Sequence, residues 1–108
     1  HDEGWYMMFC TAAQHWSERY RANNPQSPVS GSHYLVGKSP RGPWSVAPGP
    51  FLDGAEPCRR YAGKLVVTTE GLALMGFIHT TPYADFVGVV SDPLPVELEA
   101  TGLLHLRD

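Results

Sequence analysis

Residues 63–79 read GKLVVTTEGLALMGFIH and contain two apolar segments separated by a short polar turn. The segments Gly63–Thr69 and Leu72–His79 are rich in β-branched and other apolar residues, a composition typical of strands. Thr69-Glu70-Gly71 joins them, and its glycine can take the positive φ that a tight hairpin turn requires. This stretch therefore predicts a β-hairpin.

The rest of the chain has similar short apolar segments with turn residues between them. Further strands are expected at Trp5–Thr11, His33–Lys38, Trp44–Ala47, Phe86–Ser91, Pro95–Glu99 and Leu103–Leu106. Ala12–Ala22 has helical potential, and Asn23-Asn24-Pro25 ends it after a few turns at most. Between the strands, Pro40, Pro43, Pro48 and Pro50 prevent any helix from continuing. The sequence predicts an all-β fold.

Composition limits the function classes. The chain has 108 residues, 43% of them apolar, which suits one small domain with a packed core. Its 11 glycines and 10 prolines predict many turns. Charged residues make up 18%, the net charge is −3, and no basic stripe is present, so we expect no nucleic-acid partner. No apolar run is long enough for a membrane-spanning helix, so no membrane partner is expected either. The sequence does not indicate a cellular compartment.

Two similar units follow one another. Each has a turn that ends in glycine, a strand, a loop, a second strand that ends in a serine and proline step, and a further strand. If each unit is a four-stranded antiparallel blade of about 40–45 residues, the chain is a partial β-propeller of about two blades. Residues 1–53 would form an incomplete first blade with a long loop at 12–32, and residues 54–108 the second blade. A small Greek-key sandwich with similar turns is the alternative.

Two stretches carry a more specific pattern. The first is Gly31–Trp44, GSHYLVGKSPRGPW, which follows the aromatic segment Gly4–Cys10, GWYMMFC. The second combines Arg60–Leu65, RYAGKL, with Leu74–Phe77, LMGF, and Gly88–Val96, GVVSDPLPV. Together they resemble the third and fourth blades of five-bladed β-propeller glycosidases, glycoside hydrolase families 32 and 43, over nearly the whole chain. The resemblance implies a hydrolase that acts on fructosides or arabinosides.

Glycosidases of this kind need two carboxylic acids that flank the scissile bond. In the families that the chain resembles, the proton donor lies on the strand before the aromatic strand. That strand would precede His1, so we expect neither catalytic acid within these 108 residues. Asp2 and Glu3 are expected in a turn at the end away from the pocket, as exposed carboxylates without a catalytic role.

Three segments are expected on the pocket side. The loop Ala12–Ser32 carries His15 and Trp16, and aromatic faces stack on sugar rings. The alternative is that the aromatic residues of this loop pack back on the blade. The segment Gly54–Gly63 carries three further candidates for substrate binding, Glu56, Arg60 and Tyr61. The third segment, His79–Asp85 with Tyr83, is interpreted as a turn.

Arg60 and Tyr61 enter the next innermost strand, where the resemblance implies contact with substrate hydroxyls. The alternatives are a structural salt bridge for Arg60 and a packed phenol for Tyr61. Glu56, next to Pro57 and Cys58, is the carboxylate closest to the expected pocket. We therefore expect a carbohydrate partner bound at the pocket rim.

Neither a metal nor another cofactor is expected. The five histidines are scattered, and Cys10 and Cys58 do not form a pair at ligand spacing, so both are expected as free thiols. The sequence thus predicts a portion of a glycoside hydrolase that contributes the rim of the pocket. The alternative is a non-catalytic carbohydrate-binding or structural β domain. Unpaired blade edges also predict self-association.

Overall fold

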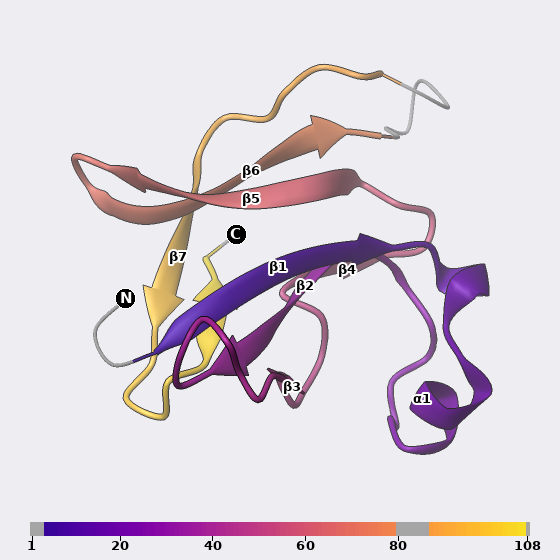
Figure 1. The fold of residues 1–108 in the computed structure, drawn as a ribbon. Coiled ribbons are helices and arrows are strands. Elements are labelled where there is room, and N and C mark those ends of the chain that lie inside the picture. The colour runs from indigo at the N-terminus through magenta and orange to yellow at the C-terminus, as the bar shows by residue number, and fades with distance from the viewer. Residues whose placement is uncertain (1–3, 80–86, 108) are drawn as a thin grey trace.

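The computed structural model describes residues 4–79 and 87–107. The predicted turn at Asp2 and Glu3, the segment around Tyr83 and residue Phe86 lie outside these ranges. Within them the chain is mostly β, as predicted, and forms two antiparallel sheets of four strands each (Figure 1). The first sheet contains β1 (Trp5–Thr11), β2 (Ser30–Gly37), β3 (Ser45–Val46) and β4 (Asp53–Ala55), and the second contains β5 (Arg60–Thr68), β6 (Gly71–Ile78), β7 (Leu94–Leu98) and β8 (Leu104–Leu106).

In the first sheet, β2 is the central strand. It pairs with β1 along its whole length, from Gly31 opposite Thr11 to Gly37 opposite Trp5. On its other side, β3 pairs with one end and β4 with the other, so two short strands flank β2 there in place of one continuous strand. The strand β4 was not predicted from the sequence. A Cβ on Gly31 would lie 2.0 Å from the carbonyl oxygen of Asp53, so glycine is what lets β4 approach β2.

The second sheet has the order β5-β6-β7-β8, in which each strand pairs with the next along the chain. The predicted hairpin is confirmed, with Gly71 at φ 118°. The predicted strand Phe86–Ser91 is not a continuous strand over its described residues. Residues 87–91 hydrogen-bond to the end of β6, but Val90 makes an isolated bridge there, with Phe77. Gly88, at φ 79°, breaks the extended backbone there. The strand β7 then pairs with the first half of β6, and β8 completes the sheet.

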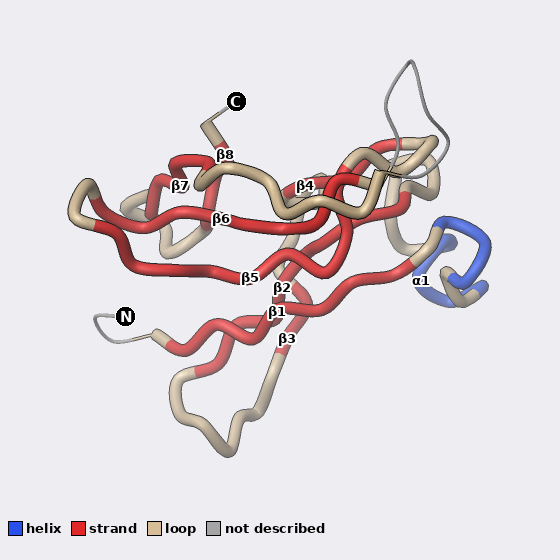
Figure 2. Tube along the Cα trace, turned by 90° about the horizontal axis from the view of Figure 1, so that it is seen from above, coloured by secondary structure: helices blue, strands red, loops and turns tan. Residues whose placement is uncertain are grey.

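The two sheets pack against each other through one apolar core, and β5 is the strand of the second sheet that lies next to β1 and β2 (Figure 2). The buried core side chains come from both sheets and their loops: Tyr34, Ala47, Leu52, Leu74, Val96 and Leu104. A buried hydrogen bond joins the sheets, from the Gly63 amide to Ser32 Oγ at 2.8 Å. Next to it the register of β5 shifts between Tyr61 and Lys64, and Ala62 has a φ of 53°. This bulge brings the backbone of β5 onto β2.

The loop that joins β1 to β2 contains a 3₁₀ turn, η1 (Ala13–His15), and a short helix, α1 (Glu18–Ala22). The predicted helical potential before Asn23 is therefore confirmed. Ser17 caps α1, since its Oγ accepts a hydrogen bond from the Tyr20 amide at 3.1 Å. Among the described residues, no helix is long and apolar enough to cross a membrane.

The two sheets divide the chain within residues 56–59, because β4 still belongs to the first sheet. The division expected between residues 53 and 54 falls inside this strand. The strand β1 has a partner on one side, β2, and its other side is an edge of the first sheet. Trp5 and Met7 on this strand remain 49% and 45% exposed. The first sheet therefore presents an apolar outer surface next to an open edge.

Candidate functional site

Several strand ends meet on one side of the molecule. The end of β1 pairs with the start of β2, the start of β2 pairs with β4, and the start of β5 pairs with the end of β6. Figure 1 shows these ends on the same side, near the loop that carries α1. We call this region the strand-end site. It brings together three of the predicted site residues, Glu56, Arg60 and Tyr61.

Arg60 is held by an ion pair with Asp53. Its Nε lies 2.8 Å from Asp53 Oδ2, and its Nη2 lies 2.9 Å from Asp53 Oδ1, so the two groups meet in a bidentate arrangement. The side chains are 15% and 7% exposed, respectively. Such a charge-assisted pair is stronger than a neutral hydrogen bond and fixes direction as well as distance. It holds the start of β5 against β4.

Tyr61 lies between aromatic neighbours and a thiol. Its ring centroid is 5.9 Å from that of Phe77 and 6.2 Å from that of His79. Burial raises the pKa of the Tyr61 phenol, and its hydrogen bond with Cys10 raises it further. The phenol therefore stays protonated at neutral pH and can donate a hydrogen bond to a neutral ligand.

Glu56 is exposed and links the two loops of the strand-end site. Its Oε2 accepts a hydrogen bond from Ser30 Oγ at 3.1 Å, and the same Ser30 Oγ accepts one from the Ala13 amide at 2.8 Å. Cys58, two residues further on, is buried, and its Sγ donates to the Arg60 carbonyl at 3.2 Å. Burial, with Asp53 and Glu56 nearby, raises the pKa of this thiol, which keeps it protonated and unreactive.

Trp16 packs inside the loop and does not present a ring face at a rim. It is 7% exposed, and its indole Nε1 donates to the Val29 carbonyl at 3.0 Å. Its ring stacks on Phe51 at 5.1 Å and meets the edge of Tyr20 at 4.8 Å. His15 is exposed and lines a shallow hollow of about 390 Å³ together with Trp16. Trp16 is therefore part of the packing of this loop, in agreement with the alternative that its aromatic residues pack back, and His15 lies on its surface.

His33 is a buried polar residue that the sequence analysis treated only as one of five scattered histidines. Its side chain is 1% exposed, and its Nδ1 accepts a hydrogen bond from the Leu52 amide at 3.1 Å. Its Nε2 therefore carries the proton and donates to the Ala47 carbonyl at 2.8 Å. Burial lowers the pKa of His33, and the bond to Ala47 partly opposes this. The ring stacks on Phe51 at 4.8 Å, so this histidine organises the β3–β4 loop.

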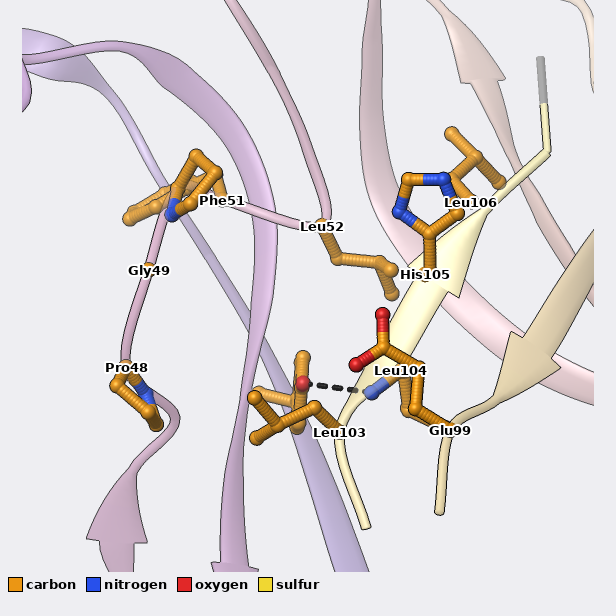
Figure 3. Close-up of a pocket in the computed structure, with 11 residues that line it drawn as sticks. Pro48, Gly49, Phe51, Leu52, Glu99, Leu103, Leu104, His105 and Leu106 are labelled. Carbon is orange, nitrogen blue, oxygen red and sulfur yellow. Dashed lines mark hydrogen bonds between the residues drawn. The ribbon is translucent and has the colours of Figure 1, made fainter. Parts of the chain in front are cut away.

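A cavity of about 270 Å³ lies between this loop and β8 (Figure 3). Its walls are mainly apolar and include Phe51, Leu52 and Leu104, with the carboxylate of Glu99 on one side. The Leu104 amide donates to Tyr34 Oη at 2.8 Å, the dashed line in Figure 3. None of the predicted substrate-binding residues lines this cavity.

Among the residues that the structure describes, the strand-end site has two carboxylates: Asp53, which is committed to Arg60, and Glu56, which is exposed and accepts from Ser30. Over residues 4–79 and 87–107, no group of three or more His, Cys, Asp or Glu side chains could hold a metal ion. A phenol, an imidazole and a carboxylate at one end of the sheets suit a ligand with hydroxyl groups.

Comparison of the chain with protein-family models, with curated proteins and with solved structures gives no match.

Proposed function

We propose that this chain is a portion of a β-propeller glycoside hydrolase that acts on fructosides or arabinosides. In this proposal the two sheets are blades, and the strand-end site contributes to the rim of the substrate pocket. The carboxylates that cleave the bond belong to a part of the protein other than these 108 residues.

One observation carries the proposal. The second sheet is a four-stranded antiparallel meander, which is the form of a propeller blade, and its first strand packs on the first sheet. Arg60 and Tyr61 open that strand on the side where β1 and β6 end. A pocket at the inner strand ends of neighbouring blades would lie beside these residues.

The roles of the side chains follow from their contacts. The protonated phenol of Tyr61 donates to a sugar hydroxyl, and its ring offers an apolar face. Glu56 accepts from a second hydroxyl, because carboxylate oxygens have several acceptor positions. Arg60 fixes the backbone of β5 through Asp53, so it positions Tyr61 and does not itself hold the sugar.

A second candidate function is a non-catalytic carbohydrate-binding or structural β domain. The commitment of Asp53 to Arg60 favours it, because this leaves Glu56 without a second available carboxylate among the described residues of the strand-end site. In this case the strand-end site binds a carbohydrate or serves the fold, and its carboxylates do not cleave a bond there.

Binding and turnover test both candidates. We expect 1-kestose or arabinotriose, added to isotope-labelled protein, to shift the NMR resonances of residues 54–61. Tyr61→Ala should raise the Kd about fivefold, because an aromatic contact contributes about 1 kcal/mol. Lys64→Ala, an exposed change on the same strand, is the control and should leave the Kd unchanged.

The outcomes separate the candidates. Hydrolysis of sucrose, inulin or arabinan by the 108 residues alone would contradict the placement of the catalytic acids elsewhere. Binding without turnover agrees with a carbohydrate-binding role. The absence of any binding at residues 54–61 would rule out the proposed rim and leave a structural role.

A further inference from the structure

A second hollow, separate from the strand-end site, lies between residues 20–26 and 46–50. It has a volume of about 590 Å³, within the range of about 300–1,000 Å³ that small-molecule pockets occupy. The polar residues that line it are Tyr20, Asn23, Asn24 and Gln26, and prolines from residues 46–50 form its apolar side. None of the described residues that line it carries a charge. We call it the amide hollow.

Two polar atoms of residues that line the amide hollow are buried without a hydrogen-bond partner. They are Tyr20 Oη and Gln26 Oε1. An unpaired buried polar group costs about 1–3 kcal/mol, so each atom gains from a partner that enters the hollow. The phenol can donate and the amide oxygen can accept, and a hydroxyl group can satisfy either one.

The wall that carries these atoms is held in place from behind. Trp16 packs against the edge of Tyr20, and Ser17 caps the short helix through the Tyr20 amide. Asn24 Oδ1 accepts a hydrogen bond from the backbone amide of Gln26 at 2.9 Å. Asn23 Nδ2 donates one to the Arg19 carbonyl of the short helix. These contacts hold the backbone of residues 17–26, from which the side chains of Tyr20 and Gln26 project.

We infer that the amide hollow is a second carbohydrate subsite, for one or two neutral sugar residues. Sugar hydroxyls supply the missing partners of Tyr20 Oη and Gln26 Oε1, and the apolar face of the ring lies against Pro48 and Pro50. Because both atoms are shielded from solvent, Tyr20 and Gln26 must turn toward the hollow when the sugar binds. The inference takes its ligand class from the proposed function and adds a site that this function does not use.

The uncharged lining sets the specificity. A uronate or phosphate group would lose its hydration in the amide hollow and find no cationic side chain there. Neutral oligosaccharides should therefore bind and acidic ones should not.

The test titrates isotope-labelled protein with 1-kestose and arabinotriose, and with trigalacturonate as the acidic control. We expect the neutral sugars to shift the NMR resonances of residues 20–26 and 46–50, and trigalacturonate to leave them unchanged. Tyr20→Phe and Gln26→Leu should each weaken this binding about five- to tenfold. Lys64→Ala, an exposed change that does not line the amide hollow, is the control and should leave this binding unchanged.

Thermal unfolding supplies a second readout. Tyr20→Phe removes a hydroxyl that has no partner, so its midpoint should equal or exceed that of the parent protein. A clear drop would mean that the hydroxyl is paired within the protein and would overturn the inference. An unchanged affinity for 1-kestose and arabinotriose in both Tyr20→Phe and Gln26→Leu would overturn it too, as would equal binding of trigalacturonate.

The location of the shifts distinguishes the two proposals. NMR shifts confined to residues 54–61 would overturn the inferred subsite at the amide hollow and leave the proposed function in place. Shifts confined to residues 20–26 and 46–50 would keep the amide hollow and overturn the proposed rim. No shift at either place would overturn both.

Discussion

His33 shows how a single buried polar side chain can determine a loop. Its two ring nitrogens satisfy the Ala47 carbonyl and the Leu52 amide, which begin and end the loop between β3 and β4. Phe51 then stacks on the ring with an angle of 4° between the planes. This pairing requires the neutral imidazole, because Nδ1 must accept a hydrogen bond.

The neutral state of His33 makes stability depend on pH. Burial lowers its pKa from 6.5 in the folded protein, so the unfolded chain binds the proton more readily. The contribution of His33 is therefore fully present above pH 6.5 and is lost as the pH falls from 6.5 toward the lower folded pKa. As the pH falls from about 7.5 to 5.5, protonation of His33 should therefore lower the free energy of unfolding, measured with urea.

Two variants isolate this effect. His33→Gln should lower stability at both pH values and flatten the dependence on pH. His105→Gln replaces an exposed histidine and should leave the dependence as in the parent protein. Equal pH dependence of stability in the parent protein and in His33→Gln would contradict the role assigned to His33.

Among the elements, β5 has a close packing constraint at the junction of the two sheets. A Cβ on Gly63 would lie 2.9 Å from both Ser32 Oγ and Leu74 Cδ1, closer than van der Waals contact allows. The Gly63 amide is also the donor of the bond that joins the two sheets. Glycine at this position therefore sets how closely β5 can approach β2.

Gly63→Ala should lower the free energy of unfolding by about 1–3 kcal/mol, because the added methyl group overpacks the sheet junction. Chemical denaturation monitored by tryptophan fluorescence measures the loss. Lys64→Ala, the next residue and exposed, should change stability by less than about 0.5 kcal/mol. Equal effects of the two changes would show that the junction is not closely packed.

Elements with a local signal could be predicted from the sequence. The hairpin at residues 63–79 combines strand composition with a glycine turn, and β1 has the predicted bounds Trp5–Thr11. The strand β4 has no such signal, since its three residues are Asp-Gly-Ala and its pairing depends on a close approach to Gly31. The error at Phe86–Ser91 has a different origin, because the positive φ of Gly88 interrupts a segment that still hydrogen-bonds to the end of β6.

Like the fold, the candidate site could be predicted from the sequence only where a local signal exists. Arg60 and Tyr61 follow from their place at the start of a predicted strand, and the structure puts them beside Glu56 at the strand-end site. The ion pair with Asp53 and the burial of Trp16 arise from loop packing, which has no period in the sequence. The amide hollow joins residues far apart in the chain and could not be expected from either segment.

At the scale of the whole molecule, the first sheet is incompletely covered. Trp5, Met7 and Val46 are 49%, 45% and 41% exposed, and β1 forms an edge of the sheet. The strand β1 contains neither a charged residue nor a proline, the usual means by which edge strands avoid pairing with other chains. We therefore propose that the isolated chain associates with itself through β1.

Sedimentation velocity at increasing protein concentration should show species larger than the monomer. Met7→Lys should shift the chain toward the monomer, because a lysine on the outer surface of an edge strand opposes association. Val67→Lys changes a residue that is 87% exposed at the β5–β6 hairpin and should have no such effect. A parent protein that remains monomeric at all concentrations would contradict the proposal.

The division of the chain at residues 56–59 has a consequence for how the two halves could be exchanged. Each sheet is built from one continuous segment, and among the described residues no strand ladder crosses this point. What joins the halves is a surface that includes the core around Leu74, the contact of Ser32 with Gly63 and the ion pair of Asp53 with Arg60. A recombined protein could therefore replace one whole half and keep every backbone pairing, provided that the new half preserves the shape of this surface.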